Sequence, residues 1–308
     1  MFVGVHSRLG PQRRRTALGT PCYSRRVSGK LFVVATPLGN LEDLSPRALE
    51  VLRTADCIAC EDTRRTARLL ARYEVTTPTL SCHRFNERER LEPILTRLGD
   101  GQRIALVSDG GTPGVSDPGA LLVAHALERG ISVEPVPGPS AVATLLSVSG
   151  LPANRYVFEG FLPHRAGERR RRLRELRSEE RTLVLFETPH RIRGALEDMR
   201  QVLGERPIVL GRELTKQHET LLRGSAAELL EQLGSGVRGE ITLAVAGFSG
   251  TSSDTEEKSS REVVARWREA LAQSDGDARG ALKLAARRLG IKRAELHRLL
   301  VELGEPTD

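Results

Sequence analysis

Apolar runs alternate with amphipathic helical stretches from Lys30 to Gly150. The runs are KLFVVAT (30–36), CIAC (57–60), IALVSD (104–109) and ISVEPVPG (131–138). Strands that are apolar throughout are typical of parallel sheets covered by helices on both faces. The first half of the chain is therefore predicted to be an α/β unit with a mainly parallel sheet.

Polar residues before the helical stretches predict where the helices begin. Ser45 precedes Pro46, which suits the N-cap and first position of a helix. Asp62 or Thr63 is the expected cap of the next helix, and Asp117 followed by Pro118 is expected to open the helix GALLVAHALERG.

A second α/β unit of about 95 residues is expected after Leu151, because the spacing of the apolar runs changes there. Its predicted strands are 156–163, 182–189, 206–214, 218–224 and 239–247, with helices RRRRLRELRSE and RIRGALEDMRQVLG between them. The last strands are closely spaced, as in hairpins, so a mixed sheet is expected.

Polar or irregular segments separate the remaining parts. Residues 1–28 show no amphipathic period and are interpreted as a disordered arm, an overextended start or a targeting peptide. The expected domains are 29–150 and 151–248, followed by a linker at 249–260 and a helical domain at 261–308. The helical domain has a helix-turn-helix pattern, and a small appendage packed on the body is an equal alternative.

The positive charge of the chain is concentrated at its start. The net charge is +7, but residues 1–30 hold seven of the 47 basic side chains and no carboxylate, leaving 40 basic and 40 acidic residues beyond. Global charge therefore does not identify a nucleic-acid partner, and only local patches can do so. No apolar run approaches the roughly 20 residues of a membrane span, so a soluble chain is expected.

The cysteines do not favour a disulfide scaffold or a metal site. Cys57 and Cys60 form a lone C-x-x-C, and only Cys82 with His83 could supply a second pair of zinc ligands. We interpret Cys57 and Cys60 as small residues of a buried strand, and we expect reduced thiols and a cytoplasmic location.

Three Gly- and Pro-rich loops follow predicted strands of the first unit: TPLGN (36–40), SDGGTPGVSDPG (108–119) and PVPGPSA (135–141). Ligands of α/β sheets bind at the carboxyl ends of strands, and glycine lets a ligand approach the main chain. The fingerprints of nucleoside triphosphate and nicotinamide sites are absent from these loops. The loops predict a pocket built largely of main chain.

The order of motifs resembles a known enzyme family. GKLFVVATPLGN, CEDTRRT, SDGGTPGVSDPG, PGPSA, FEGFLP, FETPHR and RELTKQHE appear in that order. They are similar to S-adenosylmethionine-dependent methyltransferases that modify a cytidine 2′-hydroxyl of small-subunit ribosomal RNA, members of the tetrapyrrole-methylase fold class. The resemblance covers about residues 29–248, with departures at Cys60, Phe85 and Gly110. It implies two α/β domains with the cofactor in the cleft between them, and a homodimer.

The resemblance also implies the residues that bind S-adenosylmethionine, whose polar groups main-chain amides and carbonyls can satisfy. They are Pro37, Leu38, Gly39, Asp109, Gly111, Thr112, Pro113, Val115, Ser116, Ser140, Ala141 and Leu214. Methyl transfer needs no metal, and Asp117 is more simply explained as a cap than as a cofactor ligand.

A ribose hydroxyl becomes a good nucleophile only when a base takes its proton. The catalytic candidates are Glu61, Asp62, Arg64, Glu213 and Lys216, and the base is expected to be one of the carboxylates or Lys216. Asn40, His83, Glu187, His190 and Arg212 lie in the same family-like motifs. Ion pairing within these motifs is the competing explanation.

The densest basic patch of the body is HRAGERRRRLRELR (164–177), expected on one helix. Its candidates for phosphate contacts are Arg165, Arg169, Arg170, Arg171 and Arg172, together with Arg191. The aromatic content of 4% argues against extended base stacking, so one nucleotide is expected to be extruded from the RNA.

Two other functions stay open. A methyltransferase acting on a tetrapyrrole would share the fold and the cofactor, but it would not need the arginine helix or the helical tail. A non-enzymatic DNA-binding regulator would use the helix-turn-helix pattern of residues 282–303.

Overall fold

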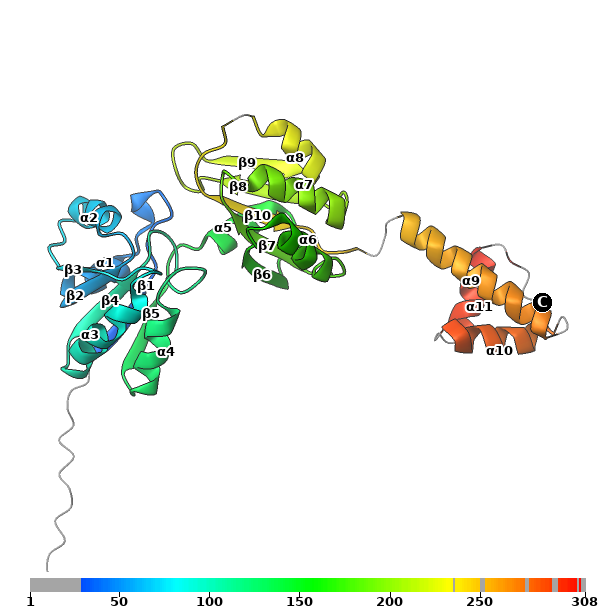
Figure 1. The fold of residues 1–308 in the computed structure, drawn as a ribbon, viewed down its shortest axis with the longest axis horizontal. Helices are drawn as coiled ribbons and strands as arrows, with labels where there is room; N and C mark the ends of the chain where they lie inside the picture. Colours follow the sequence, from blue (N-terminus) through cyan, green and yellow to red (C-terminus); the bar gives the residue numbers. More distant parts are fainter. Residues whose placement is uncertain are drawn as a thin grey trace, which may run out of the picture. The chain divides into compact units, whose positions relative to one another are not determined.

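The computed structural model describes residues 29–234, 236–249, 253–274, 277–289, 293–303 and 305, and the predicted N-terminal extension 1–28 lies outside them. The described chain forms two compact units, one with Ser45–Pro137 and the chain up to Ala35, the other with Thr36–Leu44 and the chain from Gly138 onward (Figure 1). The division falls at Pro137 rather than at the expected Gly150. The loop Thr36–Leu44 belongs to the second unit because its contacts are there.

The first unit is a parallel five-stranded sheet of order β3-β2-β4-β1-β5, as the alternating pattern predicts. Its strands are β1 (Lys30–Val34), β2 (Cys57–Cys60), β3 (Thr79–Ser81), β4 (Arg103–Val107) and β5 (Ser132–Val136). Its helices are α1 (Pro46–Thr54), α2 (Thr63–Arg72), α3 (Glu87–Gly99) and α4 (Ala120–Glu128). β3 and α3 occupy a segment for which the sequence pattern yields no prediction.

Local signals explain two of the four helix starts of this unit, those of α1 and α2. Ser45 caps α1 by accepting a hydrogen bond from the Ala48 amide, and Asp62 caps α2 by accepting one from the Arg64 amide. The expected start at Asp117 is wrong, because α4 begins after Gly119, whose φ of 118° only glycine adopts readily.

The second unit is the mixed sheet that the strand spacing predicts, with order β6-β7-β10-β8-β9. Only β6 and β7 pair in parallel. The strands are β6 (Tyr156–Phe161), β7 (Thr182–Glu187), β8 (Ile208–Arg212), β9 (Thr220–Gly224) and β10 (Ile241–Val245). The helices are α5 (Ala141–Ser149), α6 (Ala166–Glu175), α7 (Ile192–Leu203) and α8 (Ala226–Gln232), and Leu41–Asp43 forms the short 3₁₀ helix η1.

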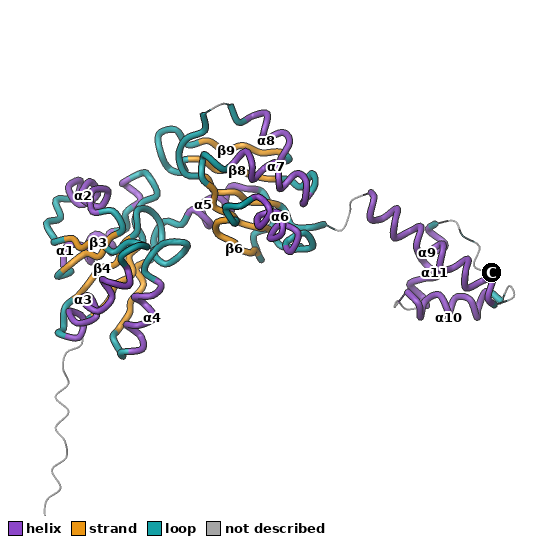
Figure 2. Tube along the Cα trace, viewed as in Figure 1, coloured by secondary structure: helices purple, strands orange, loops and turns teal. Residues whose placement is uncertain are grey.

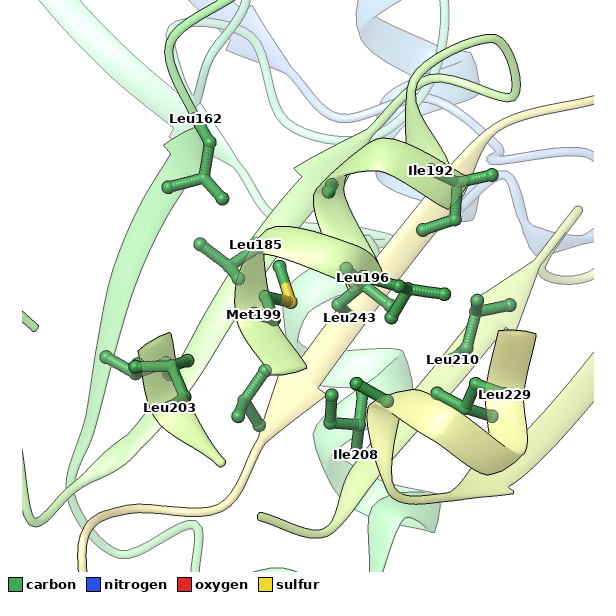
Figure 3. Packing of buried hydrophobic residues seen from close by; sticks show 14 of the residues in the cluster. Leu162, Leu185, Ile192, Leu196, Met199, Leu203, Ile208, Leu210, Leu229 and Leu243 are labelled. Carbon is green, nitrogen blue, oxygen red and sulfur yellow. The ribbon is translucent and has the colours of Figure 1, made fainter. Parts of the chain in front are cut away.

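Alternation along the central strands gives this sheet two apolar faces. On one face Leu185, Leu210 and Leu243 pack against α6, α7 and α8 (Figure 3). On the other face Val184, Val209 and Ala244 pack against α5. The sheet is therefore buried on both sides.

The helical tail consists of α9 (Ser253–Gln273), α10 (Ala278–Leu289) and α11 (Arg293–Glu302) (Figure 2). The three predicted helices are confirmed, but α9 begins inside the segment expected to be a linker. Trp267, Leu282, Leu296 and Leu300 lie in an apolar cluster made only of tail residues. The tail thus has a core of its own.

Candidate active site

The first unit carries a pocket of about 430 Å³ at the carboxyl ends of three neighbouring strands. β3, β2 and β4 are adjacent and parallel, so the residues that follow each strand meet at one edge of the sheet. The lining residues are Glu61, Asp62, Thr63, Arg64, Ser81, His83, Arg84, Phe85 and Asp109. Three of the candidate catalytic residues therefore share this pocket.

The two adjacent carboxylates of the pocket differ in proton affinity. Partial burial and the nearby Asp109 carboxylate raise the pKa of Glu61. The side chain and backbone amide of Arg64 both bond Asp62 and lower the pKa of its carboxyl to about 2. A general base works best with a pKa near the working pH, so Glu61 is the better proton acceptor of the two.

Asp109 organises the pocket. Its carboxylate accepts a hydrogen bond of 3.1 Å from the backbone amide of Asp62 and lies 3.2 Å from the guanidinium of Arg65. These contacts tie the end of β4 to the start of α2. They give Asp109, a candidate cofactor ligand, an intramolecular role.

The glycine-rich loop after β4 has the backbone that its composition predicts. Gly111, Gly114 and Ser116 have positive φ angles of 86°, 81° and 63°. Side chains with a β-carbon rarely adopt such angles, and strain of this kind concentrates at ligand sites. Gly111 and Pro113 are buried, whereas Val115 and Ser116 are exposed at the loop tip.

A second strained loop follows β8 in the second unit. Glu213 and Thr215 have φ angles of 55° and 66°, and the backbone amide of Glu213 donates to the carbonyl of Glu240. The Lys216 ammonium lies 2.8 Å from Glu213 and 3.1 Å from Glu240. The ion pairing expected as the competing explanation for the motif RELTKQHE is therefore present.

These ion pairs determine the protonation of both candidates in the loop. Burial alone would lower the pKa of Lys216, but the hydrogen bonds and charges of Glu213 and Glu240 outweigh it and raise the pKa. Burial would raise the pKa of Glu213, but Lys216 and the Glu240 amide outweigh it and lower the pKa. Lys216 is thus held as an ammonium, which is unsuited to accept a proton.

The loop Thr36–Leu44 packs on this strained loop. The Asn40 amide donates a hydrogen bond of 3.1 Å to the Thr215 hydroxyl. A β-carbon at residue 39 would overlap the Lys216 side chain, so glycine at this position lets Lys216 pack against the loop. Leu38, Ala141 and Leu214 lie in or against one apolar cluster, so the structure brings these candidate cofactor residues together within the second unit.

Several arginines predicted to contact RNA are engaged inside the protein. Arg169 is buried, and its guanidinium lies 2.7 Å from the buried Asp198 carboxylate. Arg170 lies 3.0 Å from the same carboxylate, and Arg172 chelates Glu159 at 2.5 and 2.7 Å. These side chains could reach phosphates only by leaving their partners.

The remaining arginines of that set divide in the same way. Arg191 is largely buried and binds Glu187 at 3.2 Å and the carbonyl of Leu162 at 2.6 Å. Arg165, at the N-cap of α6, and Arg171, within α6, are exposed and remain candidates for phosphate contacts. The expected helix exists, but three of its five arginines pair with carboxylates distant in the sequence.

The pocket also contains side chains that sequence reasoning missed or set aside. Ser81, Arg84 and Phe85 have no role in the predicted site, yet they line it together with Glu61. The signal for them was β3, which places Ser81 beside the end of β2 but is too short for the hydrophobic pattern to reveal. The cysteine prediction is confirmed in its structural part, since Cys57 and Cys60 are buried in β2 with free thiols.

Within the described ranges, no helix is long and apolar enough to cross a membrane. The same residues contain no group of three or more His, Cys, Asp or Glu side chains positioned to hold a metal ion.

Comparison with known proteins gives consistent matches. The sequence model of the Tetrapyrrole (Corrin/Porphyrin) Methylases matches residues 30–230. Ribosomal RNA small subunit methyltransferase I of Pseudomonas aeruginosa is 49% identical over 225 residues, 72% of this chain and 80% of that protein. The protein of the same name from Escherichia coli O157:H7 is 42% identical over 278 residues, 89% of this chain and 95% of that protein.

Solved structures share the fold at lower identity. Cobalt precorrin-4 methyltransferase aligns with a TM-score of 0.54 and 17% identity over 70% of this chain and 94% of its own. Uroporphyrin-III C-methyltransferase from Thermus thermophilus, complexed with S-adenosylhomocysteine, aligns with a TM-score of 0.52 and 20% identity over 70% of this chain and 97% of its own.

Proposed function

Because this chain belongs to the tetrapyrrole (corrin/porphyrin) methylases and, within them, to the ribosomal RNA small subunit methyltransferase I family, we propose that it methylates small-subunit rRNA. The reaction is S-adenosylmethionine-dependent methylation of a cytidine 2′-hydroxyl. The observation that carries this function is identity of 42–49% to relatives of that name over most of the chain. We propose that the reaction takes place in the cytoplasm.

The cofactor loops fit a ligand held mainly by backbone groups. Gly111 and Gly114 present main chain at positive φ without a β-carbon. We assign the amino-acid and adenine ends of S-adenosylmethionine to the backbone of residues 109–116, 37–39, 140–141 and Leu214. The bound cofactor supplies the electrophilic methyl group.

The protein's own contribution is to hold and deprotonate the ribose. Glu61 has the raised pKa that a general base requires, and we propose that it accepts the 2′-hydroxyl proton. Asp62 caps α2 and pairs with Arg64, so it fixes the start of the helix beside Glu61. Glu213 and Lys216 hold the strained loop after β8 in shape.

The tetrapyrrole alternative has weaker support. Structures of tetrapyrrole methyltransferases share the fold at 17–20% identity, which supports a common architecture and no common substrate. The DNA-binding alternative rests on the helical tail alone, whereas the relative from Escherichia coli O157:H7 matches 89% of this chain.

A methyl-transfer assay tests the proposal. Purified full-length protein and labelled S-adenosylmethionine are incubated with unmethylated small ribosomal subunits in one reaction and a tetrapyrrole precursor in another. We expect label in rRNA, recovered as 2′-O-methylcytidine. Label in the macrocycle alone would overturn the substrate assignment.

The cofactor assignment has a separate test in calorimetry of S-adenosylmethionine binding. Gly111→Ala puts a β-carbon on a backbone with φ of 86° and is expected to weaken binding. Gly99→Ala is the matched control, because a β-carbon there meets open space. Equal affinities for both variants would contradict the assignment. A homodimer, the state we propose, is tested by the molar mass in solution.

A further inference from the structure

Phe85 is the most exposed large apolar side chain of the described residues, with 90% of its surface accessible. It projects from the loop between β3 and α3 at the edge of the pocket that contains Glu61. Its ring lies 6.2 Å from the His83 ring in an edge-on arrangement. One face of an aromatic ring is thus open beside the proposed base.

The loop that presents Phe85 is well held. The Asn86 side chain accepts a hydrogen bond of 2.7 Å from the His83 amide and donates one of 3.4 Å to the Ser81 carbonyl. The Phe85 amide donates a hydrogen bond of 3.2 Å to Nδ1 of His83. These hydrogen bonds fix the loop conformation that exposes the Phe85 ring.

Exposed arginines line this pocket and continue along α2. Arg64, Arg68 and Arg72 recur every four residues on α2 and are exposed, so they form one basic stripe. Arg84 lies on the pocket wall and is also exposed. Among the described residues, Arg68 and Arg84 have no ion-pair partner, in contrast to Arg169, Arg170 and Arg172 of α6.

We infer that this pocket receives the extruded acceptor nucleotide, with Phe85 stacking on a base and Arg68 and Arg84 contacting phosphates. The inference rests on the proposed function and locates its substrate contacts on the first unit rather than on α6. The pocket volume of about 430 Å³ falls within the range of about 300–1,000 Å³ for small-molecule sites. An aromatic face beside cationic side chains is the chemistry that binds single-stranded nucleic acid.

The arrangement also explains how Glu61 would reach the proton of the 2′-hydroxyl. A nucleotide whose base stacks on Phe85 places its ribose in the pocket that Glu61 lines. Extrusion of a single nucleotide requires one stacking platform and not a row of them, which agrees with the low aromatic content of the chain.

Steady-state methylation of small ribosomal subunits by the full chain tests Phe85. Phe85→Ala is expected to raise the KM for subunits roughly 5- to 150-fold, the loss of one stacked base, and to leave the KM for S-adenosylmethionine unchanged. Phe85→Trp keeps a ring and is expected to restore the KM. A merely structural role of Phe85 would move both KM values or the unfolding midpoint instead.

The salt dependence of subunit binding tests the arginines. Arg68→Gln is expected to flatten the slope of log K against log salt concentration by about 0.7 to 0.9, the value of one phosphate contact. Arg200→Gln, an exposed arginine in the last turn of α7, is the matched control and should leave the slope unchanged.

The outcomes separate this inference from the proposed function. If the wild-type chain methylates subunits and both Phe85→Ala and Arg68→Gln match it in KM and salt slope, the inference is wrong and the function stands. If Phe85→Ala instead halves the molar mass of the protein in solution, Phe85 lies in the interface between two copies of this chain and the inference is overturned. No methylation of subunits by the wild-type chain overturns both.

Discussion

Replacing Asp198 by leucine tests whether the arginines of α6 hold the fold rather than RNA. The side chains of Arg169 and Asp198 are 9% and 6% exposed, and the two charges lie 2.7 Å apart. Without Asp198, the Arg169 guanidinium keeps only the carbonyl oxygens of His164 and Gly194, at 3.2 and 3.4 Å. A buried cation would then remain without a counter-charge.

The expected cost follows from this burial. Removing one partner of a buried ion pair costs about 3–5 kcal/mol, because the other charge stays desolvated. At about 2–4 °C per kcal/mol for a domain of this size, the second unit of the Asp198→Leu variant should melt about 6–20 °C lower. Arg170 adds little, since its side chain is 41% exposed and can return to water.

The double variant R169M/D198L provides the control. Exchange of a buried ion pair for apolar side chains of similar volume is often neutral or stabilising, so the melting temperature should recover. Thermal unfolding of the full chain followed by circular dichroism measures both variants, and methyl transfer at 20 °C measures their KM for subunits. A melting temperature of Asp198→Leu within about 2 °C of wild type would refute the burial argument. A large KM increase in the folded double variant would show that Arg169 contacts RNA.

Three further predictions address the base, a helix cap and a glycine. Glu61→Gln should lower the rate about 10²- to 10⁴-fold and abolish the fall in rate at acid pH, as a pH–rate profile would show. Because the Glu61 pKa is raised, the folded state binds the extra proton and stability falls as pH rises through that pKa, so Glu61→Gln should melt higher at pH 7 but not below about pH 4. Ser225→Ala breaks the capping box with Glu228, whose bonds measure 2.7 and 3.4 Å, and should cost about 1 kcal/mol in chemical denaturation. Gly247→Ala should lower the free energy of unfolding by about 1–3 kcal/mol in the same assay, because a β-carbon would overlap the Glu180 carbonyl oxygen. An unchanged denaturation midpoint for Ser225→Ala or Gly247→Ala would contradict the reasoning for that variant.

Much of the fold could be predicted because its signals are local. Apolar runs identify the buried strands, and Ser45 and Asp62 are caps whose partners lie two or three residues away. The start of α4 escaped prediction for the opposite reason. The Gly119 amide donates to the side chain of Glu87, 32 residues earlier, and no local pattern reports that bond.

The same distinction explains the arginine helix. The five arginines of α6 make it basic in sequence, but the carboxylates that pair with Arg169, Arg170 and Arg172 include two from other elements. Asp198 lies on α7 and Glu159 on β6, at 28 or 29 and 13 residues from their arginines. Charge patterning along the chain counts only near neighbours, so it overstates the positive field of such a helix.

The choice of base depends on environment, which the motif alone does not contain. Glu61 and Asp62 are adjacent and chemically alike, yet the Arg64 amide and guanidinium hold the Asp62 carboxyl ionised while burial and Asp109 favour protonation of Glu61. Asp109 reaches this position only because β2 and β4 are neighbours in the sheet. The strand order therefore separates two carboxylates that the sequence leaves equivalent, and the carboxylate with the raised pKa is the better proton acceptor of the two.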